Sequence, residues 1–153
     1  MDLILWRHAE AEDAGEHMPD HKRRLTTRGE KQARQVARWL QAHLPRKRRV
    51  LVSPAERTQQ TAHALETAYE IEPALALAAS PQELLSAAGW PDQEGVVLLI
   101  GHQPTLGQVA AYLMTGEEAD WTIKKGAVWW FSRRKRDGET RTQIRAVLNP
   151  DFA

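Results

Sequence analysis

Two arginines and two histidines in this sequence stand close behind short apolar runs. Arg7 and His8 follow the first run directly, His102 follows the strongest run, and Arg57 comes shortly after a third. A guanidinium offers a planar fork of N–H donors to phosphate oxygens, and an unprotonated imidazole acts as a nucleophile near neutral pH. These residue types at these places indicate chemistry on a phosphate group.

The apolar runs predict the strands that position these side chains. Residues 3–6, 50–52 and 96–100 are too short for helices and almost wholly apolar, which is typical of strands buried on both faces of a parallel sheet. Because the carboxyl ends of parallel strands share one edge of the sheet, we expect the four side chains to converge there. Two of the strand ends lead directly into predicted helices, whose free amides and dipole favour an anion. The sequence therefore predicts a dianion site, and phosphate fits best.

Three capping-box patterns predict where helices begin. In this pattern a hydroxyl and a carboxylate satisfy each other's free backbone amides, and it occurs at Thr27–Glu30, Ser53–Glu56 and Ser80–Glu83. With a fourth helix that has proline near its start, the expected helices cover residues 27–44, 54–69, 81–88 and 104–114.

The alternation of strands and helices predicts the fold class. We expect an α/β three-layer sandwich with a mostly parallel central sheet and helices on both faces. Residues 127–131 and 142–148 are expected to form an antiparallel hairpin at one edge, with a turn at Asp137-Gly138. A further edge strand is expected around residues 75–77, and residues 9–24 are expected to form a long loop.

Composition narrows the function classes. A length of 153 residues suits one domain over 1–153, and the absence of cysteine excludes disulfides and thiolate catalysis. No apolar stretch approaches the ~18 residues of a membrane span, and the amino terminus lacks a signal-peptide pattern, so we expect a cytoplasmic protein with no membrane association. A net charge of +1 argues against nucleic-acid binding by overall field. Two basic clusters, residues 46–49 and 133–136, are expected to be solvated.

The same residues resemble the signature of the histidine phosphatase superfamily. Arg7-His8-Ala9, the segment from Ser53 to Thr58 and Gly101-His102 match its three defining blocks in order and spacing. The segment 20–29 also resembles a block of the small SixA-type phosphohistidine phosphatases. The sequence departs from the family pattern at Ala9, where glycine is usual in the wider superfamily, and at Arg24, where proline is usual.

The resemblance implies a fold like that of phosphoglycerate mutase and a role for each site residue. His8 would attack phosphorus and carry the phosphoryl group, Arg7 and Arg57 would bind the non-bridging oxygens, and His102 would donate to them. Arg23 and Ser53 are further candidates for phosphate binding, although Arg23 could be a solvated charge and Ser53 only a helix cap. No metal or other cofactor is expected.

Larger members of the superfamily protonate an alcohol leaving group with a carboxylic acid. Glu83 lies at about the right sequence distance from Arg57, but its place in a capping box explains it without catalysis, and Glu10, Glu12 and Asp13 are alternatives in the first loop. Without an acid, the expected substrate is a phosphoramidate such as phosphohistidine on a phosphotransfer protein. Two alternatives stay open: a phosphatase or mutase for small phosphate esters, and a non-catalytic phosphoprotein-binding module. Nucleic-acid binding through the basic clusters is a weaker third.

Overall fold

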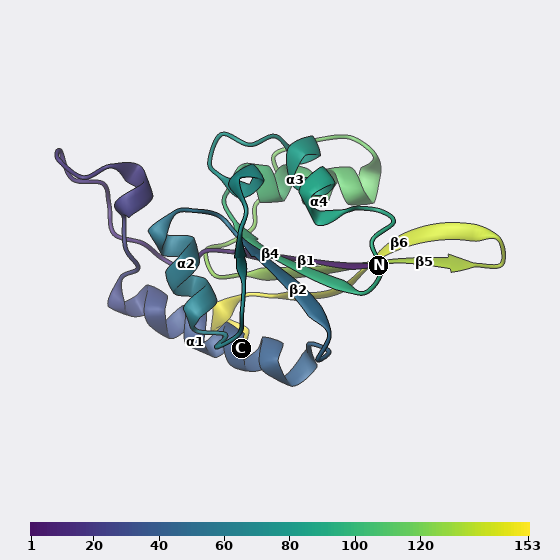
Figure 1. The fold of residues 1–153 in the computed structure, drawn as a ribbon, viewed down its shortest axis with the longest axis horizontal. Helices are drawn as coiled ribbons and strands as arrows, with labels where there is room; N and C mark the ends of the chain where they lie inside the picture. Colours follow the sequence, from purple (N-terminus) through teal and green to yellow (C-terminus); the bar gives the residue numbers. More distant parts are fainter.

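A six-stranded mixed sheet lies between two layers of helices in the computed structural model, which describes residues 1–153 (Figure 1). The strands are β1 (Asp2–Arg7), β2 (Arg48–Val52), β3 (Glu70–Ile71), β4 (Val96–Gly101), β5 (Val128–Arg136) and β6 (Glu139–Leu148). The helices are α1 (Thr27–His43), α2 (Glu56–His63), α3 (Pro81–Ala88) and α4 (Thr105–Thr115), with short 3-10 helices η1 (Asp20–Lys22), η2 (Pro73–Leu75) and η3 (Pro150–Phe152).

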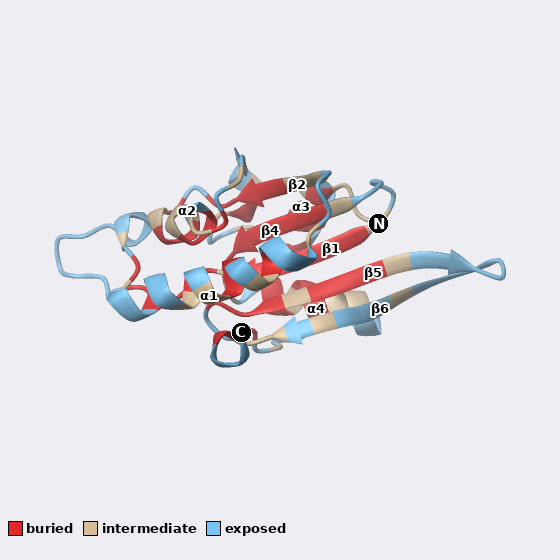
Figure 2. Cartoon of the chain, turned by 90° about the horizontal axis from the view of Figure 1, so that it is seen from below, coloured by how far each residue is buried: buried red, intermediate tan, exposed pale blue.

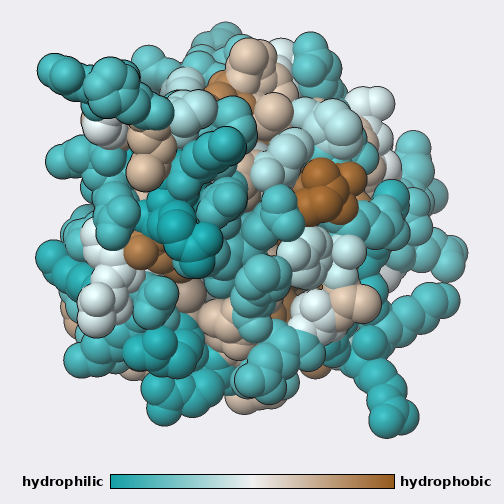
Figure 3. Space-filling model, turned by 60° about the vertical axis from the view of Figure 1, so that its left-hand side comes forward, coloured by the Kyte–Doolittle hydropathy of each residue, from teal (hydrophilic) through white to brown (hydrophobic).

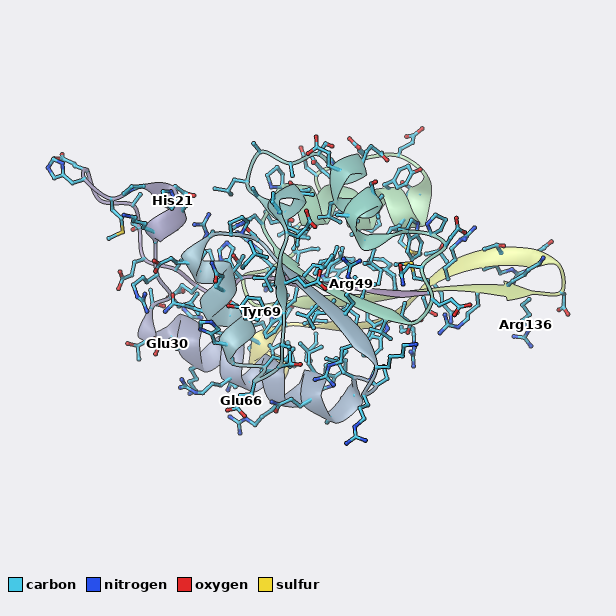
Figure 4. All side chains as sticks on the ribbon, in the orientation of Figure 1. His21, Glu30, Arg49, Glu66, Tyr69 and Arg136 are labelled. Carbon is cyan, nitrogen blue, oxygen red and sulfur yellow. The ribbon has the colours of Figure 1, made fainter.

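The strand order β3-β2-β4-β1-β5-β6 confirms the expected fold class. Strands β1 to β4 pair in parallel, whereas β5 is antiparallel to both β1 and β6. The β5–β6 hairpin is longer than expected and projects beyond the rest of the sheet, so that Arg136 lies at the opposite end of the molecule from His21 in η1 (Figure 4). No helix has the length and apolar character that crossing a bilayer would require.

The central strands are buried because helices cover both of their faces (Figure 2). On one face, Ile4 and Trp6 of β1 pack with Val36 and Leu40 of α1 and with Leu65 after α2. On the other face, Leu3 and Leu5 belong to a cluster with residues of α3 and α4. The uninterrupted apolar run of β1 is thus explained by the alternation of its side chains between two hydrophobic cores.

The register of the strands aligns the functional strand ends. Arg7 of β1 pairs with Gly101 of β4, and Val52 of β2 pairs with Ile100, so His8, Ser53 and His102 all follow at the same edge. The chain leaves β1 towards α1 on one face and leaves β4 towards α4 on the other. Neighbouring strands whose connections diverge in this way open a crevice at their carboxyl ends, where α/β proteins bind ligands.

The opposite end of β1 is held by a buried carboxylate. Asp2 is 2% exposed and accepts hydrogen bonds from Trp130 Nε1 at 2.8 Å, Ser132 Oγ at 2.9 Å and Arg145 at 2.8 Å, and it pairs with Arg134 at 2.6 Å. Burial raises the pKa of Asp2, but these hydrogen bonds and the charge of Arg134 outweigh that effect and lower it below its usual value. This network joins β1 to the hairpin at the end of β1 opposite to Arg7 and His8.

Two of the expected elements are wrongly placed by the sequence pattern. The edge strand is β3 at residues 70–71, whereas Leu75 is the last residue of η2 and residues 76–77 follow that turn. Strand β3 pairs with Leu51 and Val52 at the end of β2, through Glu70 and Ile71, so the backbone ladder rather than the apolar pattern decides its position. Helix α2 ends at His63 instead of near Tyr69, because Glu66 adopts a φ of +52° that no helix continues through.

Two of the three predicted capping boxes are also wrong. The cap of α1 is Thr26, one residue earlier than expected, and its hydroxyl accepts from the amide of Gly29 at 2.9 Å. Helix α2 begins at Glu56 after Ala55, so Ser53 is not its cap. The third prediction is confirmed in its position, since Ser80 Oγ accepts from the amide of Glu83 at 3.2 Å at the start of α3.

Candidate active site

His8 is held in one orientation by its own chain. It is 6% exposed, and its Nδ1 lies 2.7 Å from the carbonyl oxygen of Ala9. A carbonyl oxygen can only accept, so Nδ1 carries the proton and Nε2 keeps its lone pair. The amide of Ala9 in turn donates to Thr61 Oγ1 at 3.1 Å, which holds the backbone between His8 and Ala9 against α2. The arrangement presents His8 Nε2 as a nucleophile.

His102 lies beside His8, with ring centroids 5.3 Å apart, and is 3% exposed. Its Nε2 is 2.7 Å from Ser53 Oγ, which also accepts a longer hydrogen bond from the amide of Ala55 at 3.4 Å. The Ser53 hydroxyl can donate its proton to Nε2, and in that tautomer His102 carries its own proton on Nδ1. His102 is then a donor at Nδ1, which has no partner within the protein.

Arg7 and Arg57 complete the cluster. Arg7 is anchored by a 2.9 Å hydrogen bond from Nη1 to the carbonyl oxygen of Ile123, and Arg57 is only 2% exposed. The buried side-chain nitrogen and oxygen atoms without a hydrogen-bond partner are Arg7 Nε, Arg57 Nε and His102 Nδ1. A buried donor left unpaired costs about 1–3 kcal/mol, so three such donors beside a free imidazole nitrogen mark a place built for an anion.

Asp20 links the first loop to this cluster. Arg57 donates from Nη1 to the Asp20 carbonyl at 2.8 Å and from Nη2 to its carboxylate at 2.9 Å. Arg23 donates to the other carboxylate oxygen at 3.1 Å and to the carbonyl of Glu12 at 2.6 Å. Burial raises the pKa of Asp20, but the hydrogen bonds from Arg23 and Arg57 outweigh this and lower it. Arg23 is therefore oriented towards the site through a shared carboxylate.

The electrostatics keep both histidines neutral. Burial lowers the pKa of His8 to about 3, helped by the nearby charges of His102, Arg57 and Arg7 and opposed by the hydrogen bond to Ala9. Burial lowers the pKa of His102 to about 4, with Arg57 as the next contribution and Asp20 acting in the opposite direction. Burial and the charge of Arg57 also lower the pKa of Arg7 below its usual value. At neutral pH the imidazole of His8 is thus free to react.

We expect long-range ¹H–¹⁵N spectra to show His8 as the neutral tautomer protonated on Nδ1, unchanged between about pH 8 and about pH 5, where a free imidazole would titrate near 6.5. A Ser53→Ala variant serves as the control, because it removes the donor to His102 Nε2 but leaves the contact of His8 with Ala9. It should alter the ring signals of His102 and preserve those of His8. A midpoint for His8 near 6.5 would contradict the assignment.

Apart from the alternative acids Glu10, Glu12 and Asp13, seven side chains were singled out in the sequence, and the structure brings six of them together. Arg7, His8, Ser53, Arg57 and His102 meet at the strand ends, and Arg23 reaches them through Asp20. Glu83 does not join them. It is exposed at the start of α3 and lines a separate hollow with Glu72 and Gln82.

The two departures from the family pattern fit their surroundings. Ala9 is fully buried and does not adopt a positive φ, so its backbone does not need glycine. Arg24 is exposed and pairs with Glu56 at 2.9 Å, an ion pair that proline could not make.

Several residues that position the site were not expected. Thr61 supports Ala9, Asp20 joins the two arginines, and the carbonyl of Ile123 anchors Arg7. Thr61 lies one helical turn after Arg57, and Asp20 lies three residues before Arg23. Such spacings bring side chains onto one face of a helix, so they were the signals in the sequence that could have indicated Thr61 and Asp20.

Nothing in the sequence indicates Ile123. Its segment approaches α4 closely only because Gly107 has no side chain: a Cβ there would lie 1.8 Å from the carbonyl oxygen of Trp121.

No group of three or more His, Cys, Asp or Glu side chains converges as a metal site would require. The polar atoms that meet at the strand ends are instead the nitrogen donors of arginine and histidine, which suit an oxyanion.

Comparison with known proteins agrees with this geometry. The family model described as histidine phosphatase superfamily, branch 1, matches residues 3–77. The phosphohistidine phosphatase SixA of Escherichia coli is 33% identical over 125 residues, which are 76% of this chain and 76% of that protein. A SixA homologue of Haemophilus influenzae is 32% identical over 128 residues, covering 74% of this chain and 77% of that protein.

A solved structure supports the same relationship along the whole chain. The protein histidine phosphatase SixA, complexed with tungstate, superposes with a TM-score of 0.77 at 25% identity and covers 99% of this chain and 98% of its own. By its sequence, its fold and its strand-end cluster, this chain belongs to branch 1 of the histidine phosphatase superfamily.

Proposed function

We propose that the protein is a metal-independent phosphatase that removes the phosphoryl group from phosphohistidine on a phosphotransfer protein. The observation that carries the proposal is the set of three unpaired buried donors, on Arg7, Arg57 and His102, beside the free Nε2 of His8. The tungstate bound to the related SixA is a tetrahedral oxyanion, as phosphate is, and supports the assignment of an oxyanion site.

The proposed reaction proceeds in two displacements. His8 Nε2 attacks phosphorus and forms an N–P bond while the P–N bond of the substrate breaks, and the electron pair of that bond returns to the substrate imidazole. Water then attacks the phosphorus of phospho-His8, releases inorganic phosphate and restores the imidazole. Arg7, Arg57 and His102 donate to the non-bridging oxygens, where negative charge gathers in a loose transition state.

The carboxylates near the site favour a phosphoramidate over an ester. An alkoxide leaving group needs a proton from an acid, whereas the unsubstituted ring nitrogen of phosphohistidine can be protonated beforehand, so that a neutral imidazole leaves. Asp20 touches Arg57, but its lowered pKa keeps it ionised and unable to serve as that acid near neutral pH. Glu10 has its carboxylate engaged by the Thr26 hydroxyl at 2.9 Å and by Arg28 at 3.6 Å.

The covalent step is tested by trapping. Wild-type protein mixed with a ³²P-phosphohistidine phosphotransfer domain and quenched in alkali should carry acid-labile, alkali-stable label. A His8→Ala variant should carry none, because it lacks the free ring nitrogen beside the donors of Arg7, Arg57 and His102. A His43→Ala variant is the matched control, since His43 lies at the far end of α1, and should label like wild type. Equal labelling of wild type and His8→Ala would reject the mechanism.

Substrate class is tested separately by comparing kcat/KM for the phosphohistidine domain with a panel of sugar phosphates. Turnover of the domain well above that of every ester supports the proposal. Turnover of the esters alone would replace it with a phosphatase or mutase for small phosphate esters.

A further inference from the structure

A polar groove of about 530 Å³ opens beside Arg7. It lies next to the cluster of Arg7, His8, Arg57 and His102 that we propose binds phosphate, called the phosphate cluster below. The groove lies between the first half of α1, the segment 122–125 that precedes β5, and the start of η3. Apart from Pro150, every side chain that lines it is polar or charged. Figure 3 turns the side of the molecule with η1 and the start of α1 forward and shows a largely hydrophilic surface with separate small apolar patches. The groove is therefore suited to charged groups rather than to an apolar anchor.

The charge of the groove is strongly positive. Two carboxylates, Glu10 and Asp151, face five cationic side chains, which are Arg7, Arg28, Lys31, Lys124 and Lys125. Arg28 pairs with Glu10 at 3.6 Å, whereas the three lysines have no carboxylate within 4 Å and are exposed. The chain as a whole carries only +1, so this excess is a local feature.

The hollow of about 540 Å³ between α1 and α2 provides a contrast within the same molecule. It contains Arg24 and Arg34, but also Glu30 and Glu56, and Arg24 is already paired with Glu56 at 2.9 Å. Its charges are balanced and partly neutralised, so the groove beside Arg7 is the one with free positive charge.

The groove is continuous with the phosphate cluster through its backbone. Arg7 lines the groove and donates to the carbonyl of Ile123, directly before Lys124. The amide of Gly126, directly after Lys125, donates to the carbonyl of His8 at 3.0 Å. The segment with Lys124 and Lys125 is thus hydrogen-bonded at one end to Arg7, which is proposed to bind the phosphoryl group. At its other end it is hydrogen-bonded to His8, which is proposed to accept that group.

We propose that this groove binds aspartate and glutamate side chains that flank the phosphohistidine on the substrate protein. The inference rests on the proposed function and names the kind of surface that the substrate must present. Unpaired lysines next to the site attract carboxylates and orient the phosphohistidine towards His8, which raises the rate of productive encounter. We favour a protein over a nucleic acid because the groove offers no aromatic side chain on which a base could stack.

Two peptides with one central phosphohistidine provide the test, one with four flanking glutamates and the other with glutamine at those positions. Wild-type kcat/KM should favour the glutamate peptide by about 10-fold at low ionic strength, and the preference should shrink with added salt. A Lys31→Glu, Lys124→Glu, Lys125→Glu variant should lose or invert it. The ratio of the two peptides is the measured quantity, because a general effect on the chemical step changes both alike.

The matched control is Lys47→Glu, Lys135→Glu, Arg136→Glu, which changes the net charge equally at exposed positions outside the groove. It should keep the wild-type ratio. A wild type without preference, or a groove variant that retains it, would overturn the inference.

Binding is followed independently of turnover, by fluorescence anisotropy with the unphosphorylated peptides and a single-stranded oligonucleotide. Tighter binding of the glutamate peptide that only the groove variant loses supports the inference, even if no phosphohistidine is hydrolysed and the proposed function fails. The inference would be overturned if the oligonucleotide bound more tightly than the glutamate peptide and only the groove variant lost that binding. If the peptides are hydrolysed without any such preference, the proposed function stands and the groove assignment is wrong.

Discussion

Replacing Arg57 with methionine is expected to lower kcat/KM for a phosphohistidine substrate by about 100- to 1,000-fold, the usual cost of removing one preorganised donor to transition-state charge. Arg57 is almost wholly buried next to the other cations, and its Nε is unpaired. Steady-state kinetics on the phosphohistidine domain measure this loss.

The same substitution should leave the free energy of unfolding unchanged or raise it. A buried arginine with an unpaired nitrogen carries a large desolvation penalty, and removing one member of an ion pair is costly mainly when the remaining charge stays buried. Asp20, the partner that would lose Arg57, has a side chain that is 45% exposed and still bonds to Arg23. Urea unfolding of wild type and Arg57→Met provides the comparison.

Arg23→Met is the matched control for this pair of measurements. Its side chain is 23% exposed, and it reaches the site through Asp20, so we expect a smaller loss of kcat/KM. A loss of stability above about 2 kcal/mol in Arg57→Met, on the scale of breaking a structural ion pair, would show that Arg57 supports the fold rather than the site.

Lowering the pH is expected to destabilise the protein already at pH values well above those at which carboxylates titrate. The folded pKa values of His8 and His102 are lowered to about 3 and about 4, whereas an unfolded histidine titrates near 6.5. Between these values the unfolded chain binds more protons than the folded one, so lowering the pH favours unfolding. Each histidine contributes a slope approaching 1.4 kcal/mol per pH unit over about pH 6 to about pH 4.5.

The lowered pKa values of Asp2 and Asp20 act in a separate range. Their stabilisation is present above the unfolded value of 3.8 and is lost only as pH falls through and below it. Urea unfolding at several pH values between about 4.5 and about 6 therefore isolates the histidines.

A His8→Gln variant provides the internal control, because glutamine keeps a polar side chain but does not titrate. The slope of the unfolding free energy against pH should fall by about half relative to wild type, as one of two equivalent contributions is removed. An unchanged slope would show that His8 is protonated in the folded protein. Ser53→Ala, which leaves both imidazoles in place, should retain most of the wild-type slope.

The sequence allowed the central sheet and the convergence of two arginines and two histidines at its edge to be predicted together. The apolar runs before Arg7, before Ser53 and before His102 identify strands that are buried on both faces, and parallel pairing then requires their carboxyl ends to meet. Those inferences depend only on side-chain type and on the geometry of a parallel sheet, which is why they hold.

Local hydrogen-bonding patterns were less reliable guides. Ser53 has the sequence context of a helix cap, but its hydroxyl is used by His102, 49 residues later in the chain. Thr26 and Thr27 are both plausible caps for α1, and the approach of Glu10 decides in favour of Thr26, whose hydroxyl donates to the Glu10 carboxylate. In both cases a partner from another element competes with the local pattern and prevails.

By itself, then, the sequence of residues 2–8 determined a buried strand that ends in an arginine and a histidine, the residues that we propose bind phosphate and attack phosphorus, because an apolar run and its two terminal side chains are local properties of the chain. Only the tertiary structure decided the rest: the carbonyl of Ala9 that selects the tautomer of His8, the carboxylate of Asp20 on Arg57, and the lysine groove beside Arg7. The groove joins residues from α1, from the segment before β5 and from η3, which are separated by most of the chain. No spacing in the sequence encodes such a contact, since it arises from the register of the sheet and the packing of helices across it.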